Sequence, residues 1–115
     1  MTAAREPLHI GAAVLDTPRR TLRGPWRDVP VRPQPARLLL CLVRAGGRVV
    51  PLDALIAALR DPYGRASARL VQFHMADVRY ALAESGSGAV AVTTRGVGVR
   101  LEAPEPGAIA RGIAA

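Results

Sequence analysis

The sequence predicts a small α+β domain with an N-terminal antiparallel meander, three helices and a C-terminal β-hairpin. Short apolar stretches separated by turn residues come first, helical spacing dominates the middle, and two valine-bearing strands flank a glycine-containing turn near the end. The chain has 115 residues, of which 50% are apolar, so it suits one domain with one core. We expect a leader at residues 1–6, the domain at residues 7–103 and a flexible tail at residues 104–115.

The first third contains the turn signals of a meander. Asp16-Thr17-Pro18 closes a first apolar segment, which Gly11 interrupts, and Gly24-Pro25 ends a polar strand at residues 19–23. A third segment at residues 27–31 contains a proline, which a strand tolerates only at an edge or an end. We expect the exposed face of this meander to be rich in arginine, and we expect Trp26, the only tryptophan, to cover its core.

Three helices follow. Pro33 suits the first position of a helix, and Gly46-Gly47 can adopt the left-handed conformation that ends it. Residues 48–51 suffice for one short strand, and a second helix is expected at about residues 52–60. Ser67 is a suitable N-cap for a third helix that runs to about Glu84.

The third helix has two chemically different faces. At 100° per residue, its core stripe contains Val71, Met75, Val78 and Leu82. The opposite face contains no carboxylate and consists of Arg69, Gln72, Ala76, Arg79 and Tyr80. Arginine pairs with guanine and glutamine with adenine, and alanine permits close approach, so this face fits the DNA major groove. An ordinary solvated helix face is the alternative explanation.

Other candidate contacts lie beside this face and in the hairpin. His74 could reach a phosphate or serve as a structural residue, and Tyr80 could donate to a phosphate or cover apolar surface. Thr93, Thr94 and Arg95 are residue types that bind phosphates or the minor groove. A solvated turn is the alternative for the hairpin.

Charge and residue content narrow the function classes. Sixteen basic residues, all arginine, outnumber nine acidic ones and give a net charge of +7, which attracts polyanions. A GC-rich genome would explain the arginines but not the net charge. One cysteine and two histidines form no metal-ligand cluster, and neither a catalytic triad nor a phosphate loop is present. We therefore expect a cytoplasmic protein associated with the nucleoid, with no enzymatic activity, metal, cofactor or membrane partner.

Two stretches resemble motifs of the OmpR/PhoB-type winged-helix DNA-binding domains. Residues 71–82, VQFHMADVRYAL, are similar to the recognition-helix pattern V-x-V-H-I-x-x-L-R-x-x-L, and residues 94–101, TRGVGVRL, to the wing pattern T/V-R-G-x-G-Y-R-F/L. The likeness covers about residues 7–102 and implies a winged helix-turn-helix fold. This chain departs from the pattern at four positions. Asp77 stands in place of a polar or arginine residue, and Val99 in place of the wing tyrosine. Pro35 replaces a capping glutamate, and Arg60 replaces a tryptophan.

The resemblance implies a sequence-specific regulator of transcription that binds double-stranded DNA. Carried over by position, the helix contacts are Arg69, His74, Ala76, Asp77 and Arg79, and the wing contacts are Thr93 and Arg95. It also implies two copies on adjacent half-sites and contact of residues 61–66 with RNA polymerase. Members of the family usually carry a receiver domain before this one. We expect this chain to lack it, and therefore to be a stand-alone regulator or a fragment of a longer protein, without phosphorylation control in this chain.

Two other functions remain open at this point. The domain could coat DNA with little sequence preference, as an architectural protein does. It could also be a protein-binding adaptor, which Asp77 and the apolar residues Phe73 and Val97 would favour.

Overall fold

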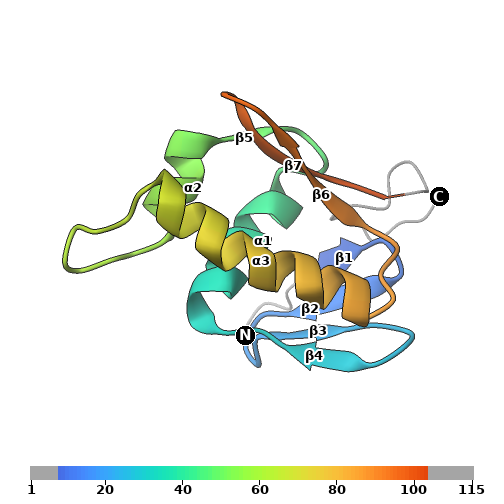
Figure 1. Cartoon of the computed structure of the whole chain (residues 1–115). Coiled ribbons are helices and arrows are strands. Elements are labelled where there is room, and N and C mark those ends of the chain that lie inside the picture. The colour runs from blue at the N-terminus through green and yellow to red at the C-terminus, as the bar shows by residue number, and fades with distance from the viewer. Residues whose placement is uncertain (1–7, 104–115) are drawn as a thin grey trace, which may run out of the picture.

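The computed structural model describes residues 8–103 and has the predicted order of elements (Figure 1). The first sheet is an antiparallel meander of β1 (Leu8–Ile10), β2 (Ala13–Asp16), β3 (Thr21–Arg23) and β4 (Asp28–Pro30). The helices are α1 (Pro33–Arg44), α2 (Leu52–Ala58) and α3 (Ala68–Glu84). A second sheet has the order β5-β7-β6 and contains β5 (Val50–Pro51), β6 (Val90–Thr94) and β7 (Gly98–Glu102). The predicted α+β winged helix-turn-helix class is confirmed, and the expected leader and tail lie outside the described residues.

One hydrophobic core joins the two sheets to the helices. The predicted stripe of α3 is confirmed, because Val71, Met75, Val78 and Leu82 are at most 2% exposed. These side chains face α1, whose buried residues are Pro35, Leu38, Leu39, Leu42 and Val43. The opposite face of α3 is thereby left to solvent. No helix within residues 8–103 is long and apolar enough to cross a bilayer.

The helix ends follow local chemistry. Pro33 begins α1 as predicted, and Arg32 at its N-cap makes no side-chain capping bond. Ser67 caps α3 as predicted, because its hydroxyl oxygen accepts a hydrogen bond from the Leu70 amide at 3.3 Å. The helix α2 ends at Ala58, before the predicted residue 60, because Leu59 leaves helical geometry and is fully buried in the core.

Removal of the Ser67 cap tests whether this side chain stabilises the start of α3. Ser67→Ala leaves the Leu70 amide without its side-chain acceptor, and we expect the free energy of unfolding to fall by about 1 kcal/mol. Urea denaturation measures the change. Ser67→Asp retains a capping oxygen and serves as the control. Equal stability of Ser67→Ala and the parent would contradict the capping role.

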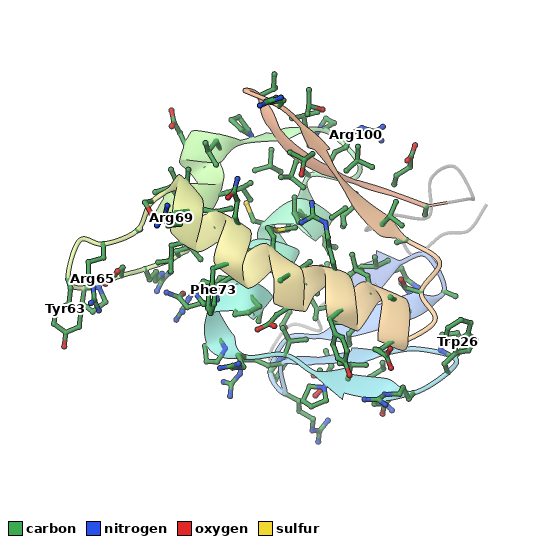
Figure 2. All side chains as sticks on the ribbon, viewed as in Figure 1. Trp26, Tyr63, Arg65, Arg69, Phe73 and Arg100 are labelled. Atoms are coloured by element: carbon green, nitrogen blue, oxygen red, sulfur yellow. The ribbon has the colours of Figure 1, made fainter. Side chains whose placement is uncertain are left out.

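Trp26 does not cover the core of the meander, and that prediction is wrong. Trp26 is 76% exposed and lies near the C-terminal end of α3 (Figure 2), where its indole packs against Gly86. A Cβ atom at Gly86 would come within 2.5 Å of the indole Cγ. The Trp26 amide also donates a hydrogen bond to the Ser85 carbonyl at 3.0 Å. The loop between β3 and β4 is therefore attached to the end of α3, while Leu22 fills the core beneath the sheet.

Candidate nucleic-acid interface

The outward face of α3 is the first part of the candidate site. Its five predicted residues are all exposed, namely Arg69, Gln72, Ala76, Arg79 and Tyr80. The fully buried stripe on the other side fixes the rotation of the helix, so these residues must face outward. This face therefore offers guanidinium, amide and hydroxyl donors to an anionic partner.

The β6–β7 hairpin is the second part. Thr93, Thr94 and Arg95 are exposed at its tip. The Val97 amide donates to the Thr94 carbonyl at 2.9 Å, and Gly96 supplies the positive φ of 74° that this turn requires. A Cβ at Gly96 would meet nothing within 4 Å, so the tip is open on that side.

The outer face of α3 and the hairpin tip border one crevice of about 170 Å³. Gln72 and Arg79 line it from α3, and Thr93, Thr94 and Arg95 line it from the hairpin. Residues that are 14 to 23 positions apart in the sequence are thus brought together. In Figure 1 the hairpin lies alongside α3, with β6 nearer to the helix than β7. Both candidate elements are accessible from one side of the molecule.

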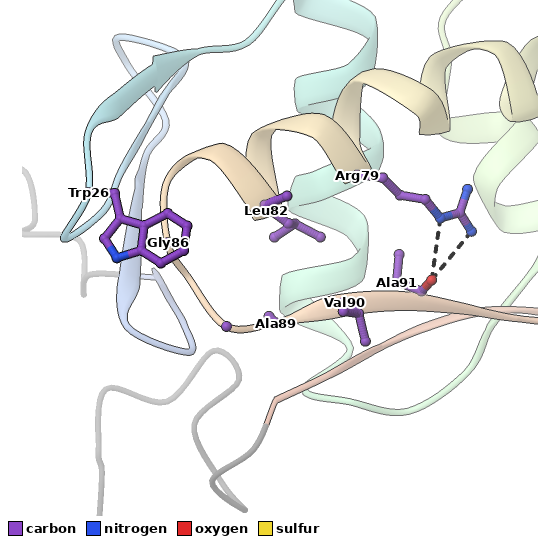
Figure 3. Close-up of a pocket in the computed structure, with 9 residues that line it drawn as sticks. Trp26, Arg79, Leu82, Gly86, Ala89, Val90 and Ala91 are labelled. Atoms are coloured by element: carbon purple, nitrogen blue, oxygen red, sulfur yellow. Dashed lines mark hydrogen bonds between the residues drawn. The ribbon is translucent and has the colours of Figure 1, made fainter.

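Arg79 connects the two parts directly. Its Nε and Nη2 atoms donate to the Ala91 carbonyl, both at 3.4 Å (Figure 3). Nη2 also donates to the Thr93 hydroxyl oxygen at 2.8 Å. Arg79 lies at one end of an apolar groove of about 440 Å³ that extends to Trp26. The helical pattern placed Arg79 on the outward face, but it contained no information on this contact with β6.

Asp77 and His74, two predicted contact residues beside the outward face of α3, are in contact with other side chains of the protein. Asp77 is half-buried, and its Oδ2 atom lies 3.9 Å from Nε of Arg32, in the segment between β4 and α1. His74 is also half-buried and packs edge-on against Phe73, with 5.1 Å between the ring centroids. Its Nδ1 atom is buried and has no hydrogen-bond partner among the described residues. These two residues lie on the flanks of the outward face.

Arg32 and Arg65 are exposed arginines that the sequence patterns did not single out. Arg65 lies in the loop between α2 and α3, with its guanidinium carbon 5.1 Å from the centroid of the Tyr63 ring (Figure 2). The Asp61 carboxylate accepts hydrogen bonds from the amides of Tyr63 and Arg65 at 2.9 and 3.1 Å. An aspartate at the start of a turn is the sequence signal for such bonds. This loop is therefore held in a defined conformation next to α3.

Comparisons with known proteins agree with this architecture. The chain is similar to the DNA-binding domain of CadC from E. coli, with 19% identity and a TM-score of 0.69 over 88% of this chain and 96% of that one. It is also similar to the DNA-binding domain of the response regulator AdeR in complex with an intercistronic region, with 20% identity and a TM-score of 0.65 over 89% and 100%. The C-terminal domain of the nisin resistance regulator NsrR, a lantibiotic response regulator, gives 21% identity and a TM-score of 0.68 over 84% and 98%. The search of curated proteins found no match.

These solved structures establish the fold. The family model for the C-terminal domain of transcriptional regulatory proteins matches residues 27–101, which include α1, α3 and all of the hairpin except its last residue. The hairpin is accordingly called the wing from here on. This chain belongs to the family of transcriptional regulatory protein C-terminal domains, the OmpR/PhoB-type winged-helix DNA-binding domains.

Proposed function

We propose that this chain regulates transcription by binding double-stranded DNA with α3 in the major groove and the wing on the backbone or in the minor groove. The observation that supports this most strongly is the shared crevice, which places the arginine-bearing face of α3 beside Arg95 of the wing. The solved AdeR domain, of the same fold, is in complex with a stretch of DNA. The net charge of +7 favours the same partner.

The candidate residues divide by the kind of contact they can make. On α3, Arg69 and Gln72 are proposed to read base edges, and Ala76 allows the helix to approach them closely. His74 and Tyr80 would donate to phosphates at the flanks of the groove. In the wing, Thr93, Thr94 and Arg95 would hold the backbone or enter the minor groove.

Asp77 adds a carboxylate at the flank of this surface. A carboxylate repels phosphate, but it can accept a hydrogen bond from the amino group of cytosine. The nearby Arg32 guanidinium offsets its charge in the free protein. We propose that Asp77 contributes to base preference at the edge of α3.

Two copies on adjacent half-sites are the proposed assembly on DNA. A single module of this kind buries only about 600–1,000 Å² on DNA, so a second copy would provide useful affinity.

The ordered loop that contains Asp61 and Arg65 is the proposed contact with RNA polymerase. With DNA as its partner, the protein is proposed to act in the cytoplasm, at the nucleoid.

Binding to two duplexes across a salt series tests the proposed function. One duplex is selected from a random pool by binding to the protein, and the other is a scrambled version of it. We expect tighter binding to the selected duplex, and a slope of log K against log salt of about −0.9 for each phosphate neutralised.

The same measurement separates the other two functions. Equal affinity for both duplexes with a steep slope would indicate an architectural protein. No binding to either duplex at low salt would refute DNA binding. It would favour a protein-binding adaptor, for which Phe73 and Val97, 67% and 51% exposed, would supply an apolar surface.

A further inference from the structure

We propose that Arg79 is a positioning residue, which fixes the wing against α3 and acts on DNA through the wing instead of reading a base. This inference rests on the proposed function, because it concerns how the two DNA-binding elements are held together. Sequence position alone favours a base contact for Arg79. The side-chain contacts of this residue point to a different role.

Arg79 provides the side-chain link between the two elements. Within residues 8–103, every side-chain hydrogen bond between α3 and the wing has the Arg79 guanidinium as its donor. Other contacts between α3 and β6 are made by packing, which fixes direction less strictly than hydrogen bonds donated by a planar guanidinium. The relative placement of α3 and the wing therefore depends on this side chain.

The acceptors on β6 explain why an arginine is needed here. β6 lies at the edge of its sheet, and antiparallel pairing leaves the backbone groups of alternate residues of an edge strand without a strand partner. Ala91 and Thr93 are two residues apart, so both belong to one alternating set along β6. The guanidinium donates to the carbonyl of Ala91 and to the hydroxyl of Thr93 at the same time. A single arginine thus satisfies one unpaired backbone carbonyl of this edge strand and binds one of its side-chain hydroxyls.

The position of Thr93 connects this link to DNA. Its hydroxyl oxygen accepts from the charged guanidinium at 2.8 Å, which leaves the hydroxyl proton available for a second partner. Thr93 is exposed, and Arg95 follows two residues later at the tip. Because a hydrogen bond from a charged donor polarises its acceptor, the hydroxyl becomes a better donor to a phosphate oxygen. Arg79 therefore influences the proposed DNA contacts of Thr93 and Arg95 without touching DNA itself.

Amide hydrogen exchange of the DNA-free protein tests the link alone. Arg79→Met retains an unbranched side chain and removes all the donors, so we expect the β6 and β7 amides to exchange about tenfold faster while the α1 amides are unchanged. Thr93→Val removes one acceptor at nearly constant shape and should give a smaller increase. Arg69→Met is the matched control, because it removes an arginine from the same helix face that makes no described hydrogen bond to the wing. Exchange in Arg79→Met equal to that of the parent would overturn the proposal.

A double-mutant cycle on the selected duplex tests the consequence for DNA. If Arg79 acts through the wing, Arg79→Met should weaken binding about tenfold in the parent and less than about threefold in the Arg95→Ala background. Its effect should be the same at every base pair of the site. Additive effects, or relaxed preference at one base pair, would show that Arg79 touches DNA itself and would overturn the proposal. If the parent binds neither duplex, the proposed function fails, and the exchange experiment still decides whether Arg79 fixes the wing.

Discussion

Replacement of Gly98 by alanine is expected to lower the free energy of unfolding by about 3 kcal/mol or more. Gly98 begins β7 and pairs with Pro51 of β5. A Cβ atom at this position would lie 2.0 Å from the carbonyl oxygen of Val50 and 3.0 Å from Cα of Pro51. Both are backbone atoms, so no side-chain rotation can relieve the collision, and β5 would have to separate from β7. The expected loss of stability lies at or above the upper end of the usual cost of overpacking, which is about 1–3 kcal/mol.

Gly96 in the same hairpin is the matched control for Gly98. A Cβ at Gly96 meets nothing within 4 Å, but the residue has a φ of 74°. Gly96→Ala should therefore cost only the backbone strain, about 1 kcal/mol. Urea denaturation of both variants measures the difference. Equal stability of Gly98→Ala and the parent would show that β5 does not approach β7 as closely as described.

Reversal of the charge at Arg95 is expected to have the largest effect on DNA binding. Arg95 is exposed at the tip of the wing and lines the crevice shared with α3. Arg95→Glu removes one cation from the proposed interface and adds a repulsive charge next to the phosphates. We expect the affinity to fall by roughly 10–100-fold, on the selected and the scrambled duplex alike, with a slope that is shallower by about 0.9.

An arginine outside the proposed interface provides the control for Arg95→Glu. Arg44 is exposed in the last turn of α1, the helix that packs against the inner side of α3. Arg44→Glu makes the same change in net charge, so its effect measures the contribution of overall charge alone. Binding measured by fluorescence anisotropy at several salt concentrations compares the two variants. Equal losses for both would contradict a specific role for the wing tip.

The parts of the fold that follow local rules could be predicted from the sequence. The spacing of Val71, Met75, Val78 and Leu82 fixes which side of α3 is buried. Ser67 marks the start of that helix through its own hydroxyl group. The outward face of α3 follows from the same periodicity, because a helix buried on one side must expose the other.

Contacts between distant segments could not be predicted in this way. Trp26 packs on Gly86, sixty residues later in the chain, and Arg79 donates to Thr93, fourteen residues later. Neither contact leaves a periodic signal, because it depends on how β4 and β6 are placed on α3. Asp77 likewise has Arg32 as its neighbour only in the folded chain. The sequence therefore identifies candidate DNA contacts, whereas the structure shows which of them are already engaged with the protein.

We propose that α3 and the wing bind one duplex together from one side of the domain. Backbone amide chemical shifts, recorded during titration with the selected duplex, test this joint binding. We expect the outward face of α3 and residues 93–97 of the wing to shift together, with one common dissociation constant. Shifts confined to one of the two elements, or centred on the meander strands, would contradict it.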